Sequence, residues 1–242
     1  MRALSTTEIL SVWERGCGQP PVRRAFILLE AVCDEVLEVP QLTIGRRDEL
    51  LMALREKTFG PRLNTLATCP RCGDPLETDL DIAALRVVPP AEIKAELLLR
   101  ADGHELRFRP LTSADLAGLS PAHDPAANQL RLLTQCLLSA TREGREIPPS
   151  ELPPNLVSLL AEKMAQADPQ AETLLAFRCP ACGHEWQGLF DIVSFFWAEI
   201  TACALRLLRE VHVLAAAYGW GEQEIVRLSP QRRNAYLELV GV

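Results

Sequence analysis

The chain has 242 residues, of which 48% are hydrophobic and 24% are charged, and its formal net charge at pH 7 is −7. These proportions fit one large domain or two ordinary ones and exclude a wholly disordered chain. The negative charge argues against a nucleic-acid-binding protein, which needs a basic patch for its phosphate contacts. No stretch of roughly 20 residues is apolar enough to span a bilayer, and the first residues lack the apolar core of a signal peptide.

The first part of the chain, residues 1–66, is expected to be helical. Three helices are predicted here, over residues 5–15, 20–36 and 46–58. Ser5-Thr-Thr-Glu8 has the form of a capping box, in which each side chain satisfies a backbone donor of the other residue. Thr43 is placed to cap the third helix, whose inward leucines are expected to be Leu50, Leu51 and Leu54.

Two cysteine motifs of the same form, Cys69-Pro-Arg-Cys72-Gly and Cys179-Pro-Ala-Cys182-Gly, lie over a hundred residues apart. Two residues between paired cysteines let one tight turn aim both sulfurs at the same ion, and four thiolates close a structural zinc site. Strand-like sequence adjoins both motifs, at residues 76–82, 173–177 and 185–190. The pattern predicts a zinc ribbon split between residues 67–86 and 173–190. Four buried or redox-active cysteines are the alternative, and His184 is a competing ligand.

The segment between the motifs, residues 87–172, is interpreted as an inserted α+β module. Asp102-Gly103 lies between two apolar runs, which is a strong signal for a β-hairpin. Asp115 is expected in a short helix that begins near Thr112 or Ser113. Two longer helices are predicted over residues 128–139, with Leu130, Leu133, Cys136 and Leu137 inward, and over 155–167. Zinc would then clamp the two ends of this module together.

The last part, residues 191–242, is predicted to be a helical bracket. Asp191 caps a long helix that ends near Tyr218, and two shorter helices follow. The expected apolar stripe of the long helix comprises Trp197, Ile200, Ala204, Leu208, Val211, Ala215 and Tyr218. Trp220 and Tyr236 are interpreted either as packing anchors or as contacts to a partner. Arg232 and Arg233 are expected on a solvated face, and contact with an acidic partner surface is the alternative.

The predicted fold class is therefore mainly α with a small β zinc ribbon (α+β). No catalytic and no cofactor-binding residue is predicted, because the four histidines fall in no nucleophile or metalloprotease arrangement and no phosphate-binding glycine loop is present. Outside the two motifs, Cys33, Cys136 and Cys203 are expected to be small buried hydrophobes, and Cys17 to be exposed.

Three stretches together resemble the T-even-like phage baseplate hub assembly chaperone family, which occurs in contractile phage tails and related bacterial contractile injection systems. They are residues 43–60 with the first cysteine motif, residues 179–191, and residues 211–237 with their Tyr-Gly-Trp turn and Ser-Pro. The resemblance implies a non-enzymatic assembly factor or structural subunit whose partners are baseplate or hub proteins. It carries over no catalytic residue.

Three hypotheses follow for the function. The first is a baseplate or hub component that is made in the cytoplasm and incorporated into a phage-tail-like particle. It is expected to bind no nucleic acid and to have no membrane span. The second is a zinc-ribbon nucleic-acid-binding or transcription adaptor, against which the acidic residues of the first predicted hairpin argue. The third is a metalloenzyme, for which a site closed by four thiolates is the wrong design.

Overall fold

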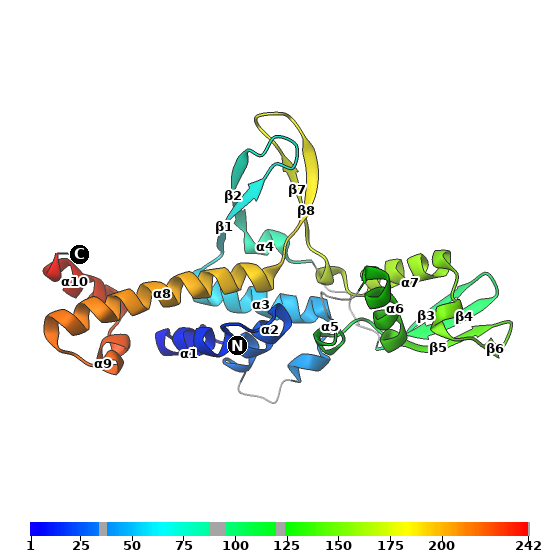
Figure 1. Cartoon of the computed structure of the whole chain (residues 1–242), viewed down its shortest axis with the longest axis horizontal. Coiled ribbons are helices and arrows are strands. Elements are labelled where there is room, and N and C mark those ends of the chain that lie inside the picture. The colour runs from blue at the N-terminus through cyan, green and yellow to red at the C-terminus, as the bar shows by residue number, and fades with distance from the viewer. Residues whose placement is uncertain (34–37, 88–94, 120–123, 242) are drawn as a thin grey trace. The chain divides into compact units, whose positions relative to one another are not determined.

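The computed structural model describes residues 1–33, 38–87, 95–119 and 124–241 (Figure 1). The chain divides into two compact units. Unit 1 comprises Met1–Val36 and Ile192–Val242, and unit 2 comprises Leu37–Asp191. Both units contain helices, and the strands belong to unit 2, so the fold class is α+β, as predicted. The finer division into 1–66, 67–86 with 173–190, 87–172 and 191–242 stays a prediction.

Unit 1 is built around one long helix. Its elements are α1 (Thr6–Gly16), α2 (Pro21–Glu30), α8 (Ile192–Tyr218), α9 (Glu222–Arg227) and α10 (Pro230–Val240), and the four shorter helices all pack on α8. Gly16 lets α1 approach α8 closely, because a Cβ at this position would lie 2.2 Å from the Trp197 ring. The Arg24 guanidinium covers that ring, 4.7 Å from its centroid. Within the described residues, no helix is both long and apolar enough to cross a membrane.

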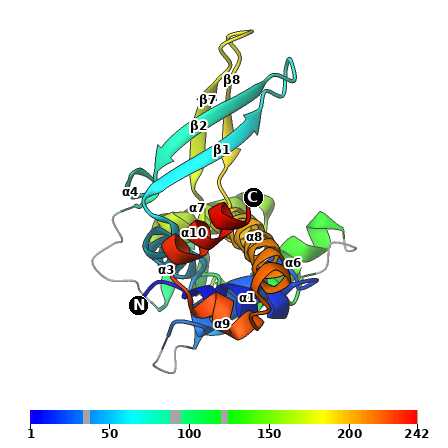
Figure 2. The same ribbon diagram turned by 90° about the vertical axis from the view of Figure 1, so that its left-hand side faces the viewer.

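Unit 2 begins with η1 (Val39–Gln41) and α3 (Ile44–Phe59) and continues into an antiparallel hairpin of β1 (Arg62–Thr68) and β2 (Pro75–Asp81). A short α4 (Ile82–Leu85) follows. The chain returns through η3 (Pro169–Ala171) to a second hairpin, β7 (Leu174–Arg178) and β8 (Glu185–Leu189). Figures 1 and 2 both show the two hairpins side by side.

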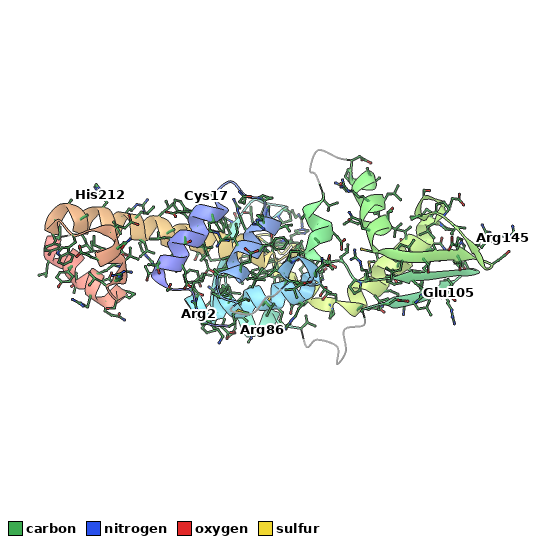
Figure 3. All side chains as sticks on the ribbon, turned by 90° about the horizontal axis from the view of Figure 1, so that it is seen from below. Arg2, Cys17, Arg86, Glu105, Arg145 and His212 are labelled. Carbon is green, nitrogen blue, oxygen red and sulfur yellow. The ribbon has the colours of Figure 1, made fainter. Side chains whose placement is uncertain are left out.

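Between the hairpins, the chain forms an antiparallel sheet in the order β3-β4-β5-β6, which carries the labelled Glu105 and Arg145 in Figure 3. Its elements are β3 (Leu97–Ala101), β4 (His104–Phe108), α5 (Ser113–Ala117), α6 (Pro125–Cys136), β5 (Leu137–Arg142), β6 (Arg145–Glu146), η2 (Pro149–Glu151) and α7 (Pro154–Ala167). One core holds them together, made of Leu99, Leu106, Phe108, Leu133, Ala140, Leu152, Leu156 and Leu160. This segment therefore has an apolar core of its own.

A buried carboxylate joins this segment to α3. Asp168, at the end of α7, accepts a 2.8 Å hydrogen bond from the backbone amide of Gly45 in the first turn of α3. A Cβ on residue 45 would lie 2.1 Å from the Asp168 Oδ1 atom, so only glycine lets the carboxylate reach this helix end. Ile44 adds a backbone hydrogen bond to the Leu111 carbonyl at 3.2 Å.

Several predicted elements differ from the structure. The helix expected to reach Val36 ends at Glu30, and residues 34–37 lie outside the described residues; no glycine or proline marks this end. The helix expected to reach Ser139 ends at Cys136, because Leu137–Arg142 pairs with β4 instead. Leu130, which was expected inward, is 43% exposed. Strand β1 was not predicted.

The side-chain predictions for unit 1 also need correction. Arg233 was expected in solvent, but it is buried and ion-paired with Glu210. The buried face of α8 differs from the predicted stripe in the second half of the helix. Leu207 and Leu214 are buried, whereas the predicted Leu208 and Val211 are half-buried. Tyr218 is 37% exposed, and Cys33 is half-buried rather than buried.

Candidate metal centre

The four predicted ligands lie in the turns of the two hairpins of unit 2. Cys69 and Cys72 connect β1 to β2, and Cys179 and Cys182 connect β7 to β8. Side chains of alternating residues along each hairpin are half-buried, and between β7 and β8 the Phe177 and Trp186 rings stack at 5.2 Å. The hairpins thus hold both turns in fixed positions.

The backbone of the two turns follows the same hydrogen-bond pattern. The Cys69 amide donates to the Asp74 carbonyl and the Gly73 amide donates to the Cys69 carbonyl, both at 2.9 Å. The Cys179 amide donates to the His184 carbonyl and the Gly183 amide to the Cys179 carbonyl, again at 2.9 Å. Gly73 and Gly183 have φ angles of 80° and 70°, a left-handed conformation that glycine adopts without strain. The two motifs therefore contribute equivalent halves to one site.

The sulfur positions fit a tetrahedral ion. All four Sγ atoms lie within 4.8 Å of one another. Two of the separations join sulfurs of different hairpins, and they are 3.5 Å for Cys72 and Cys179 and 3.7 Å for Cys69 and Cys182. A disulfide needs about 2.05 Å, so these cysteines are not bonded to each other. Four thiolates bound at about 2.3 Å around a tetrahedral zinc ion lie about 3.8 Å apart, close to the separations observed.

The protonation of the cluster favours a cation. Burial raises the pKa of the Cys69 thiol, but the backbone amides of Cys72 and Arg71 donate to the sulfur and bring the pKa down to about 7. At Cys72 the backbone amide of Asp74 lowers the pKa, and burial and the neighbouring thiols outweigh it, so that the pKa rises to about 12. One thiolate forms easily and its neighbour resists ionisation. A divalent cation removes this conflict, because it binds thiolates and displaces their protons.

His184 lies beside the cluster but is not one of its members. Within the described residues, the group of potential ligands consists of the four sulfurs alone. The His184 ring instead stacks on Trp186, with 5.9 Å between the centroids. Its backbone serves the site, because its amide hydrogen-bonds to the Cys182 sulfur and its carbonyl accepts from the Cys179 amide.

The remaining cysteines and histidines are dispersed. Cys136 and Cys203 are buried, as predicted, and Cys17 is exposed (Figure 3). His104 is buried, with Nδ1 2.7 Å from the Asp102 carbonyl oxygen, whereas His212 is exposed on α8. None of them joins the cluster among the described residues.

Two polar clusters of unit 2 escaped the sequence reasoning. Asp115 accepts two hydrogen bonds from Arg109, at 2.7 and 2.8 Å, and further ones from Thr112. The other is the Asp168 contact to α3. Asp115 was placed correctly in a short helix, but nothing in the spacing identified Arg109 as its partner. Both clusters hold elements together, and neither contributes a residue to the group of four sulfurs.

Comparison with known proteins adds one match. Residues 27–197 match the family model described as T4 bacteriophage base plate protein. No curated protein and no solved structure matches the chain.

Proposed function

Because the chain belongs to the T4 bacteriophage base plate protein family, we propose that it is a structural subunit or assembly factor of the baseplate or central hub of a contractile tail. The tail is that of a phage or of a related bacterial contractile injection system. The observation that carries the proposal is the family match, which covers well over half of the chain. Membership of this family implies association with other baseplate proteins. We further propose that the protein is made in the cytoplasm and acts in an assembling particle.

Cys69, Cys72, Cys179 and Cys182 are proposed to bind one zinc ion. The support is the equivalence of the two turns, the sulfur separations of 3.5 and 3.7 Å and the matching chemistry of four thiolates. When bound, the ion supplies a cross-link between the two hairpins. Four protein ligands leave no coordination position for a substrate or an activated water, so the role is structural, and the split zinc ribbon is part of this proposal.

A non-enzymatic role follows from the same two features. The family is one of baseplate proteins, and the candidate site is closed. A nucleic-acid adaptor is the alternative, but the hairpin of β1 and β2 presents Glu77, Asp79 and Asp81 to solvent, which would repel phosphates. A mobility-shift assay that finds micromolar, salt-sensitive DNA or RNA binding would favour that alternative.

Affinity purification from the producing cell tests the main proposal. A tagged chain replaces the untagged one, and mass spectrometry identifies the proteins that accompany it in the free pool and in purified particles. We expect baseplate or hub proteins in at least one pool, with an unrelated tagged cytoplasmic protein as the control. Their presence in the free pool alone identifies an assembly factor, and their presence in particles identifies a subunit. Their absence from both pools would contradict the proposal.

A further inference from the structure

One face of the hairpin of β1 and β2 has no covering partner within the described residues. Exposure alternates strictly along the hairpin after Leu63, and one set of side chains is exposed throughout. We call this set the acidic face; it comprises Arg62, Asn64, Leu66, Thr68, Pro75, Glu77, Asp79 and Asp81. The opposite set, which includes the fully buried Leu63, is more enclosed. The acidic face is therefore the accessible side of a two-stranded sheet.

A leucine stands in the middle of this face. Leu66 is 70% exposed and lies directly opposite Glu77 in the strand register. A hollow of about 510 Å³ adjoins it, lined by Asn64, Thr65, Leu66, Glu77, Thr78 and Asp79. A single exposed leucine is ordinary on a protein surface. Here Leu66 borders a hollow that is also lined by the carboxylates of Glu77 and Asp79. If an apolar side chain of a partner entered the hollow, the residues next to it in the partner would lie close to these two charges.

The net negative charge of the hairpin favours a positively charged partner. Between residues 62 and 81, the acids Asp74, Glu77, Asp79 and Asp81 outnumber the bases Arg62 and Arg71. Arg62 forms an ion pair with Asp79 at 2.5 Å, whereas Glu77 has no ion pair among the described residues. A divalent cation held by four thiolates would add a net charge of about −2 at the tip of this hairpin.

We propose that the acidic face binds a lysine-rich, extended segment of another baseplate protein, with an apolar side chain of that segment in the hollow beside Leu66. This inference rests on the proposed function. Glu77 and Asp79 are two residues apart on one strand, which places them on the same face about 7 Å apart. An extended segment with lysines at every second position matches that repeat.

Charge also excludes the other candidate occupants. Nucleic acids and anionic lipid surfaces carry the same sign as the acidic face. A second copy of this chain has a net charge of −7 and would be repelled in the same way. Complementary charge raises the rate of encounter and fixes the register of a complex, so a basic protein segment is the occupant that this face fits.

A charge reversal with a matched control tests the inference. Glu77→Lys/Asp79→Lys changes the charge by the same amount as Glu14→Lys/Glu162→Lys, in which both acids are exposed and lie on α1 and α7. Each tagged variant replaces the natural chain in the producing cell, and baseplate proteins recovered with it are quantified by mass spectrometry at low and high salt. Metal content and circular dichroism establish that each variant is folded.

We expect recovery of baseplate proteins to fall about tenfold or more for Glu77→Lys/Asp79→Lys and to stay within about twofold of the unaltered chain for the control. Equal recovery by both variants, or equal loss from both, would overturn the inference. If the unaltered chain itself recovers no baseplate protein, the proposed function fails too, which distinguishes the two failures.

Zero-length cross-linking identifies the partner group. A carbodiimide joins a carboxylate to a lysine amine in direct contact, and the chain's own lysines are only Lys57, Lys94 and Lys163. We expect an amide between Glu77 or Asp79 and a lysine of another baseplate protein. Amides to this chain's own lysines alone, or none at all, would overturn the proposal.

Discussion

At the scale of single residues, the sulfur cluster depends on each of its four members. We expect Cys69→Ser to lower the zinc content from about one ion per chain to near zero and to destabilise unit 2, because metal-binding energy is folding energy at such a site. Elemental analysis of protein purified without added metal measures the ratio. Cys17→Ser, at an exposed cysteine outside the cluster, is the control and should keep its zinc. A natural chain free of zinc would refute the metal assignment.

Asp48 is a second residue with a measurable signature. Burial raises its pKa to about 6, despite the adjacent Arg47 guanidinium 2.7 Å away. The folded state therefore holds this proton more tightly than the unfolded state, whose carboxyl has its ordinary pKa. The stabilisation is complete below about pH 4 and is lost as the pH rises through 6, by roughly 3 kcal/mol for a shift of this size.

Urea unfolding at pH 4, 5, 6 and 7 tests this linkage. Asp48→Asn should remove that part of the pH dependence. The difference in the free energy of unfolding between the unaltered protein and Asp48→Asn should therefore change between pH 4 and pH 7. Asp124→Asn changes an exposed carboxyl and is the control. If the free energy of unfolding has the same pH dependence in the unaltered protein and in Asp48→Asn, the raised pKa of Asp48 is contradicted.

The Arg233–Glu210 pair shows what single-residue reasoning missed. Arg233 donates to Glu210 at 2.8 Å and to the Leu228 carbonyl at 2.6 Å, and its side chain is 4% exposed. A charged residue in a predicted amphipathic helix is normally exposed, and its partner lies 23 residues earlier on α8. Local sequence therefore held no signal for its burial.

We expect Arg233→Ala to lower the free energy of unfolding of unit 1 by about 3 kcal/mol, because it leaves the Glu210 carboxylate largely buried without its main partner. Arg232→Ala, at the adjacent exposed position, should change that free energy by less than about 0.5 kcal/mol. Urea denaturation followed by tryptophan fluorescence measures both. Similar effects of the two substitutions would contradict the buried ion pair.

At the scale of elements, Gly45 determines how α3 meets Asp168. Gly45→Ala would place a methyl group 2.1 Å from the Asp168 Oδ1 atom, so the carboxylate must move away from the helix end. We expect a loss of about 1–3 kcal/mol in the free energy of unfolding of unit 2.

Gly118→Ala is the matched control for that substitution. Its added Cβ has its nearest contact at 3.5 Å, and residue 118 has a φ of −83°, which alanine adopts readily. Chemical denaturation of both variants gives the comparison. A Gly45→Ala protein as stable as Gly118→Ala would show that the carboxylate contact contributes little.

Elements with local signals were predicted well. Asp102 and Gly103 have φ angles of 51° and 72°, the conformation of a two-residue hairpin turn, and the hairpin was predicted from this dipeptide. The predicted capping box at Ser5 likewise begins a helix where expected, and the short helix that holds Asp115 begins at Ser113, as predicted. Strand β5 was misread because Leu137 and Leu138 suit a helix as well as a strand, and pairing with β4 decides between them.

For the Tyr218, Trp220 and Tyr236 rings, the sequence did not predict which contacts they make. Trp220 lies 4.7 Å from Tyr218 and 4.8 Å from Tyr236, so the rings pack on one another as anchors of the α8–α10 corner. The sequence identified these aromatics but left open whether they pack or contact a partner. Their mutual contacts support packing, and a role in docking stays a prediction.

At the scale of the whole molecule, metal removal should act on only part of the chain. Isolated two-stranded hairpins are marginally stable in water. Chelation should therefore accelerate amide hydrogen exchange in residues 62–81 and 174–189, with little change in α8 or in the core around Phe108. Exchange followed by mass spectrometry measures this, and added zinc should restore protection. Uniform loss of protection across the chain would contradict separate stabilisation of these parts.

The sequence order of the four cysteines has a consequence for synthesis on the ribosome. Cys69 and Cys182 are 113 positions apart, with the sheet and helices of residues 97–167 between them. At about 5–20 residues per second, the first pair of thiols waits roughly 6–20 seconds for the second. The intervening segment has its own core and can complete its folding during that interval. The four thiols would then come together late in synthesis. Their assembly into one site would require that the segment between the two hairpins has been made and that its two ends lie close together.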